Sequence, residues 1–286
     1  MRWWILAAAL AALGVWPLAA VDAERVPARA GLGGLEPVEE SFATSGDPAR
    51  RTGGADAPRP APRHEGSHGD PIAAAPAPPA VPQPDEPATP AAARVLRLLD
   101  RVDRRVEQTR YQHQTFVAEW RGLYAWDCSG MVNWVLERAA RGARNRILSV
   151  RPVARDYVEI IESSPLRGSY KGWQKIAHIE DLRPGDLFAW KRPRNWPRDD
   201  TGHVGFVLAR PRPVPGHHRA YRVRVADATS VPHENDTREE DGAGGFGRGT
   251  MLFTVDDGGS PVAYGWYGAS SDGVVPTHVA FGRVHY

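Results

Sequence analysis

The pattern of apolar and polar positions along this chain changes its period near residue 187. Before that point, separate stretches place apolar side chains three or four residues apart, the spacing that predicts amphipathic helices with one buried face. Beyond it, short runs rich in β-branched and aromatic residues are separated by Gly, Pro and Asp, which is typical of strands joined by turns. The predicted helices cover residues 94–106, 127–142 and 153–161.

The predicted strands follow one another closely, and this limits how they can pair. Most connections are too short for the crossovers that parallel strands require, whereas hairpins need only a few residues. One such turn is predicted at Asp256–Gly259, whose sequence is Asp-Asp-Gly-Gly. We therefore expect an α+β fold in which N-terminal helices pack on an antiparallel β-sheet. The predicted strands are residues 187–190, 204–208, 221–226, 251–255, 262–266 and 279–284.

The first third of the chain differs in composition from the rest. One basic residue precedes an apolar run that ends near Ala20, followed by small residues, so residues 1–23 are predicted to be a cleaved signal peptide. Retention of this run as an N-terminal anchor is the alternative. Residues 24–93 hold about half of the 26 prolines and few aromatic residues, which predicts a disordered Pro/Ala-rich linker. The folded domain is predicted over residues 94–286.

Charge and cysteine content narrow the possible classes of function. The 36 Lys and Arg against 34 Asp and Glu leave a net charge of +2, which gives no reason to expect a nucleic-acid partner. A single cysteine excludes an intrachain disulfide framework and any cysteine-based zinc cluster. The predicted signal indicates a secreted or periplasmic bacterial protein with no membrane span after cleavage. In such a protein the lone thiol is an inert buried group, an intermolecular bridge or a reactive nucleophile.

Cys128 stands directly after Asp127, the residue expected to cap the second helix. Unpaired N–H groups and the positive end of the helix dipole favour a thiolate at such a position, which suits a nucleophile. A free cysteine also packs readily as a small hydrophobic side chain in a core. The local sequence alone does not separate these two interpretations.

Two further residues could complete a catalytic set with Cys128. His203 opens an apolar strand and could accept the thiol proton, although a histidine there can also be structural. Asp227 ends the next long strand and could hold the imidazole through its other ring nitrogen, or simply begin a turn. The sequence therefore predicts a Cys-His-Asp constellation with a helix start supplying the thiol.

Three short motifs occur in a fixed order around these residues. They are Asp127–Gly130 (Asp-Cys-Ser-Gly), Asp181–Leu187 (Asp-Leu-Arg-Pro-Gly-Asp-Leu) and Gly202–Gly205 (Gly-His-Val-Gly). In this order they resemble a divergent member of the NlpC/P60 family of papain-like cysteine peptidases, over roughly residues 111–227. The resemblance implies a papain-like fold within the α+β class.

The resemblance also implies roles for individual residues. Cys128 would be the nucleophile, His203 the general base and acid, and Asp227 the orienting group, at a position where the family most often has histidine. A tyrosine upstream of the cysteine would lie near the substrate and the oxyanion; Tyr111 is the better match and Tyr124 the alternative. The sequence after Tyr111 lacks the Gly-rich pattern usual in the family.

The function implied by this resemblance is hydrolysis of amide bonds in peptidoglycan stem peptides, without a cofactor and by a monomer. An amidase or acyltransferase could use the same triad on another amide-containing polymer. A different class, a cell-wall binding module with an unused triad, is the second hypothesis. The bond cleaved, the role of the linker and the oligomeric state are open at this point.

The remaining histidines were considered as metal ligands. None follows the H-E-x-x-H spacing or a comparable pattern, so no metal site is predicted. His233 lies close after Asp227 and is either an accessory residue or a competitor for the third catalytic position. The other candidate histidines are His217, His218 and His278.

Overall fold

The computed structural model describes residues 85–193 and 201–286. The predicted signal peptide and most of the predicted linker lie outside the described residues. The first helix, α1 (Pro90–Arg105), begins inside the segment assigned to the linker. Thr89 accounts for this start, because its hydroxyl accepts a hydrogen bond from the Ala92 N–H and Pro90 occupies the first helical turn, where its missing N–H costs nothing.

Three further helices and three short 3-10 turns follow α1. The predicted helices over residues 127–142 and 153–161 are confirmed as α2 (Cys128–Ala139) and α4 (Ala154–Glu162). A short helix, α3 (Arg141–Arg144), continues directly from α2. The 3-10 turns are η1 (Glu119–Arg121), η2 (Ile179–Asp181) and η3 (Gly268–Ser270).

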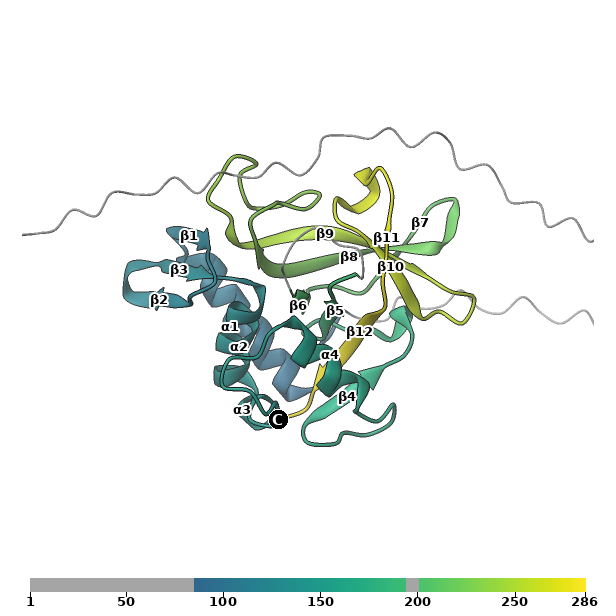
Figure 1. The fold of residues 1–286 in the computed structure, drawn as a ribbon, viewed down its shortest axis with the longest axis horizontal. Helices are drawn as coiled ribbons and strands as arrows, with labels where there is room; N and C mark the ends of the chain where they lie inside the picture. Colours follow the sequence, from purple (N-terminus) through teal and green to yellow (C-terminus); the bar gives the residue numbers. More distant parts are fainter. Residues whose placement is uncertain (1–84, 194–200) are drawn as a thin grey trace, which may run out of the picture. The chain divides into compact units, whose positions relative to one another are not determined.

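A nine-stranded sheet forms the second half of the domain (Figure 1). Its strand order is β11-β10-β9-β8-β6-β5-β12-β4, with β7 paired to β8, and every pairing is antiparallel. The predicted turn at Asp256–Gly259 joins β9 to β10 as expected. The strands are β4 (Trp173–Ile176), β5 (Leu187–Lys191), β6 (Gly202–Val207), β7 (Arg212–Val214), β8 (His217–Thr229), β9 (Gly245–Val255), β10 (Pro261–Gly265), β11 (Val275–Pro276) and β12 (Val279–Val284).

A small separate sheet, which the sequence did not predict, precedes α2. It consists of β1 (Gln108–Tyr111), β2 (Phe116–Ala118) and β3 (Leu123–Trp126), with β3 in the centre. β1 runs parallel to β3 and β2 antiparallel to it. Because β3 ends one residue before the cap of α2, this sheet fixes where the helix begins.

Two apolar clusters lie on opposite faces of the large sheet. The first joins α1, α2 and α4 to alternate residues of the central strands, for example Val204 and Phe206 of β6. The second contains the intervening residues, including Phe188, Trp190 and Phe253, and is free of α-helices. The helices therefore cover one face of the sheet, and α2 lies across β6 and β8.

The turn before β5 explains one of the sequence motifs. Asp186 is fully buried and accepts hydrogen bonds from the Arg183 N–H and from the guanidinium of Arg283 on β12, at 2.8 Å each. Gly185 has a φ of +87°, which disfavours any other residue. The motif thus ties the start of β5 to β12.

The structure confirms the α+β class with an antiparallel sheet. Within the described ranges, no helix has the length and apolar character needed to cross a membrane.

Candidate functional site

The first turn of α2 places the thiol. The Asp127 carboxylate accepts hydrogen bonds from the Gly130 N–H at 2.6 Å and the Ser129 hydroxyl at 2.9 Å, so the predicted cap is confirmed. A Cβ at Gly130 would collide with the Thr115 side chain, which accounts for the glycine in this motif. Cys128, the first residue of the helix, is free and 7% exposed. Its backbone N–H therefore lies in the first turn of α2, where the N–H groups have no acceptor within the helix.

His203 and Asp227 meet because β6 and β8 are neighbours in the sheet. Phe206 pairs with Ala226 in this ladder, which brings the beginning of β6 beside the end of β8. His203 Nε2 lies 2.6 Å from Asp227 Oδ2, and both side chains are buried. The Cys128 side chain acts on the same imidazole, because its charge and hydrogen bonding raise the pKa of His203. Since Nε2 is taken by Asp227, Nδ1 is the nitrogen available to the thiol.

Gly205 permits this close packing of β6. It faces Phe188 on β5, and a Cβ at this position would lie 2.6 Å from the Phe188 ring and 2.9 Å from the Ala226 carbonyl oxygen. Neither neighbour could yield easily, since one is a core ring and the other is backbone. The glycine therefore allows β6 to sit against both β5 and β8 two residues beyond His203.

The surroundings of His203 favour its charged form. Burial by itself lowers the pKa of this imidazole, but the charge of Cys128 and the hydrogen bonds with Asp227 and Cys128 outweigh burial and raise the pKa to about 9. Aromatic rings enclose the imidazole, with the Trp190 and Trp266 ring centroids each 5.1 Å away. His203 is thus an imidazolium at neutral pH in this environment.

Asp227 is the centre of a larger charge cluster. His233 Nε2 lies 2.7 Å from Oδ2, the same oxygen that faces His203, and an Arg238 terminal nitrogen lies 2.9 Å from Oδ1. Arg238 also pairs with Asp236 at 2.6 Å. Burial alone would raise the pKa of Asp227, but the charges of His233 and Arg238 and the histidine hydrogen bonds hold it well below its usual range. The carboxylate is therefore ionised although its side chain is fully buried.

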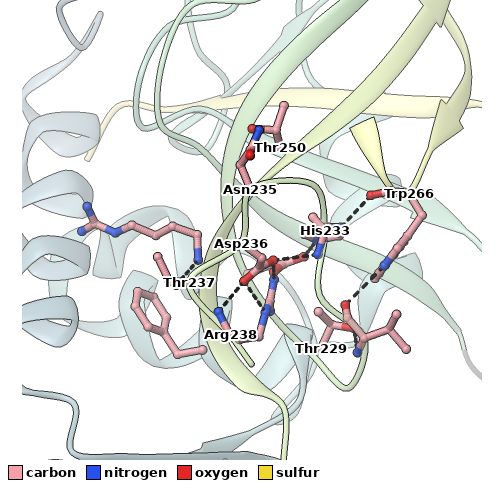
Figure 2. Close-up of polar contacts among 12 residues, drawn as sticks. Thr229, His233, Asn235, Asp236, Thr237, Arg238, Thr250 and Trp266 are labelled. Atoms are coloured by element: carbon pink, nitrogen blue, oxygen red, sulfur yellow. Dashed lines mark hydrogen bonds and ion pairs between the residues drawn. The ribbon is translucent and has the colours of Figure 1, made fainter. Parts of the chain in front are cut away.

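The loop between β8 and β9 supplies these supporting groups (Figure 2). Asp236 accepts the His233 N–H at 2.7 Å, which closes the loop on itself. His233 Nδ1 lies 3.0 Å from the Trp266 carbonyl oxygen, which can only accept, so Nδ1 carries a proton. Its Nε2 faces a carboxylate that can likewise only accept when ionised. Both ring nitrogens of His233 thus face acceptor oxygens.

The two predicted tyrosines have different environments. Tyr111 is half-buried at the end of β1 and pairs with Trp126 of β3, so its backbone lies beside the residue that precedes the cap of α2. Tyr124 is fully buried against Trp126 and Trp134 in the core. Burial, with a smaller contribution from Glu119, raises its pKa. Of the two, Tyr111 has the placement that suits a residue at the rim of the site.

Four further residues around the site have no signal in the sequence. Asp236 and Arg238 lie in a charged loop without any local sign of their burial. At the cap of α2, His113 and Arg151 approach Asp127 Oδ2 to 3.4 and 3.7 Å, and both are mostly exposed. They come from two different loops, so only the folded structure brings these side chains to the start of α2.

Metal binding is the other chemistry that this cluster could support. His203, Asp227 and His233 each offer a ligand atom, and these atoms lie within 4.8 Å of one another. Arg238 contacts the other oxygen of Asp227, and its charge opposes a cation at this place. The hydrogen-bond assignment satisfies all of these groups without a metal. Of the other candidate histidines, His217 and His218 are exposed at the start of β8, and His278 pairs with Glu162 at 2.9 Å.

Fold and site together define an α+β protein in which a helix-start cysteine, a histidine and a buried aspartate from an antiparallel sheet form one cluster. The chain is 30% identical over 191 residues to the uncharacterized protein R653 of Acanthamoeba polyphaga mimivirus, in an alignment that covers 58% of this chain and 82% of the viral protein. It belongs to the same family as that protein. No family model matches the chain, and no solved structure matches it.

Proposed function

We propose that this protein is a cysteine hydrolase with a papain-like domain of the NlpC/P60 type, acting on amide bonds. The observation that carries the proposal is the 2.6 Å contact between His203 Nε2 and Asp227, beside a helix-start cysteine whose side chain raises the pKa of the same imidazole. A nucleophile, a base within reach and a third group that orients the base are the parts that covalent acyl transfer needs. The motif order around these residues adds to this support.

The proposed reaction begins with the Cys128 thiolate attacking the amide carbonyl carbon. A carbon–sulfur bond forms, and the negative charge moves to the carbonyl oxygen, where the Cys128 backbone N–H at the start of α2 stabilises it. Tyr111 is the proposed second contact to this oxygen or to the substrate. The His203 imidazolium then gives its proton to the leaving nitrogen as the carbon–nitrogen bond breaks.

The second half of the reaction releases the acyl group. His203, now neutral, takes a proton from water, and the resulting hydroxide attacks the thioester carbonyl carbon. The carbon–sulfur bond breaks, which regenerates the thiolate and imidazolium and yields a free carboxylic acid. Asp227 keeps the imidazole ring oriented throughout, because its carboxylate is itself held by His233 and Arg238.

For substrate we propose peptide bonds in peptidoglycan stem peptides, and for location the secreted or periplasmic space of a bacterium. The substrate proposal rests on the resemblance to NlpC/P60 peptidases, and the location on the apolar N-terminal run. A monomer without a cofactor is part of the same proposal.

Two measurements test the function. Alkylation of Cys128 by iodoacetamide should proceed at about pH 6 and should slow by at least about tenfold in His203→Ala, because the imidazolium no longer supports a thiolate. Equal labelling rates in both proteins across the pH range would contradict the nucleophile assignment. Digestion of purified peptidoglycan, with Cys128→Ala as control, should then release fragments whose masses identify the bond. If neither protein releases products although the Cys128 thiol is reactive, the result overturns only the proposed substrate.

A further inference from the structure

A basic groove lies at the C-terminal end of α2, remote from the thiol. It has a volume of about 450 Å³ and runs between α1 and the end of α2. Four arginines line it, together with Glu119 and the apolar Leu98; the arginines are Arg94, Arg97, Arg101 and Arg138. Cys128 and Arg138 are ten positions apart on one helix, which corresponds to about 15 Å along the axis.

Two of the four arginines are fixed by the protein itself. Arg94 donates from Nε to the Ala139 carbonyl oxygen at 2.7 Å. Arg138 donates to the Trp134 carbonyl oxygen at 3.2 Å and lies over the Trp134 ring, 3.9 Å from its centroid. Both cations thus stabilise the negative end of the helix dipole. Their own positions are set before any ligand arrives.

The other two arginines have no such structural role. Arg97 and Arg101 are exposed, and neither makes a hydrogen bond or ion pair within the part of the chain that the structure describes. The acidic residues of α1 are turned elsewhere, since Asp100 and Asp103 pair with Arg248 of β9 at 2.8 and 3.2 Å. Among the described residues, neither Arg97 nor Arg101 forms an ion pair with a carboxylate of its own helix.

The balance of charge in the groove is strongly positive. Four guanidinium groups face one carboxylate, that of Glu119, which lies 3.9 Å from Arg138 Nε and so pairs only loosely with it. The groove-lining arginines of α1 are about 4.5 and 6 Å apart along the helix axis, in the order Arg94, Arg97 and Arg101. They form a linear array of charge rather than a single point. Such an array fits an extended ligand with repeated negative groups.

We propose that this groove binds a linear polyanion of repeated phosphate groups without nucleobases, such as a polyphosphate. A phosphate presents more acceptor oxygens than a carboxylate, in a tetrahedral arrangement, and can accept from guanidinium groups that approach from different sides. Two fixed and two free arginines converge on this groove, and this arrangement suits a phosphate. This binding is separate from the proposed thiol chemistry and does not depend on it.

The test uses inorganic polyphosphate of about ten units as the probe, with titration calorimetry on the full chain at low ionic strength. The groove variant is Arg97→Gln/Arg101→Gln. The matched control is Arg212→Gln/Arg222→Gln, which removes the same charge from two exposed, cross-strand arginines of β7 and β8. We expect the groove variant to weaken binding by at least about tenfold, and the control and Cys128→Ala to bind within about twofold of the wild type.

Four results would overturn the proposal. These are absence of measurable polyphosphate binding, an equal loss of affinity in the groove and control variants, and equal affinity for poly-L-glutamate of the same charge. The fourth is tighter binding of a single-stranded oligonucleotide of matched charge than of polyphosphate, which would assign the groove to nucleic acid. Because Cys128 alkylation is measured separately, failure here is distinguishable from failure of the hydrolase proposal.

Discussion

The charged groups near the two ends of α2 differ in their burial and in their pairing. Near the N-terminal end, a cluster of buried charged groups is fully paired: Asp227 is held by His203, His233 and Arg238, and Arg238 is shared with Asp236. At the C-terminal end, Arg97 and Arg101 are exposed and face a groove without an acidic partner.

This difference follows from the cost of dehydrating an ion. A buried charge without a partner is strongly destabilising, so the N-terminal cluster must be complete before the domain is stable. Exposed cations keep their water and cost the fold little, which leaves them available to a ligand. Charge therefore has a structural role at one end of the helix and is free for binding at the other.

The largest expected effect comes from removing the shared carboxylate. Asp227→Ala should lower the free energy of unfolding by about 3–5 kcal/mol, because two imidazoles and a guanidinium lose their buried counter-charge. Urea denaturation followed by circular dichroism measures this. In the control, Asp257→Ala, an exposed surface pair with Arg219 is lost, and the change should stay below about 1 kcal/mol. Equal losses of stability in Asp227→Ala and Asp257→Ala would contradict the expectation that a buried charge depends more strongly on its partner than an exposed one.

A second prediction concerns pH. The pKa of His203 is raised from 6.5 to about 9 in the folded protein, so its stabilising contribution is complete below about 6.5 and is lost as pH rises through about 9. The stability of the wild type relative to His203→Gln should therefore decline across this window. Denaturation midpoints of both proteins at several pH values test it. A difference that is constant with pH would contradict the raised pKa.

The third prediction addresses His233. Its replacement by Gln should cost about 1.5–3 kcal/mol of stability, because a charged hydrogen bond to Asp227 is lost. It should also reduce turnover without changing Cys128 exposure. Urea denaturation of both proteins measures the first effect, and iodoacetamide labelling of Cys128 measures its exposure. An unchanged free energy of unfolding in His233→Gln would contradict the role of the hydrogen bond to Asp227.

The smallest effect is expected at the other end of α2. Arg97→Gln/Arg101→Gln should change the free energy of unfolding by no more than about 0.5 kcal/mol, since neither side chain has a hydrogen-bond or ion-pair partner among the residues that the structure describes. The same denaturation assay provides the comparison with Asp227→Ala. A loss of several kcal/mol would show that these arginines support the fold after all.

Much of this architecture was predictable because it depends on local sequence. Helical spacing, the Asp127 cap and the Asp-Asp-Gly-Gly turn act over a few residues, and the structure confirms all three. The contact between His203 and Asp227 agrees with the expectation that strands close in sequence pair in an antiparallel sheet.

The parts that were missed depend on contacts between distant segments. The parallel pairing of β1 with β3 joins short, half-polar strands that carry no periodic signal. Arg238 occurs in a run of charged residues, which predicts a solvent-exposed segment, yet its side chain is 3% exposed. Only the closed path of the loop between β8 and β9 turns it toward Asp227. The choice between Tyr111 and Tyr124 likewise required the tertiary environment of each ring.

The glycine two residues after His203 has a further consequence. Because Gly205 lies against Phe188 and the Ala226 carbonyl, the separation of β6 from its neighbours is fixed by backbone packing. The 2.6 Å contact between His203 and Asp227 therefore depends on strand spacing as well as on the two side chains that make it. Even one methyl group added at Gly205 would push the strands apart and misalign the pair, although neither His203 nor Asp227 had been replaced. The alignment of His203 with Asp227 thus depends on the lack of a side chain at Gly205.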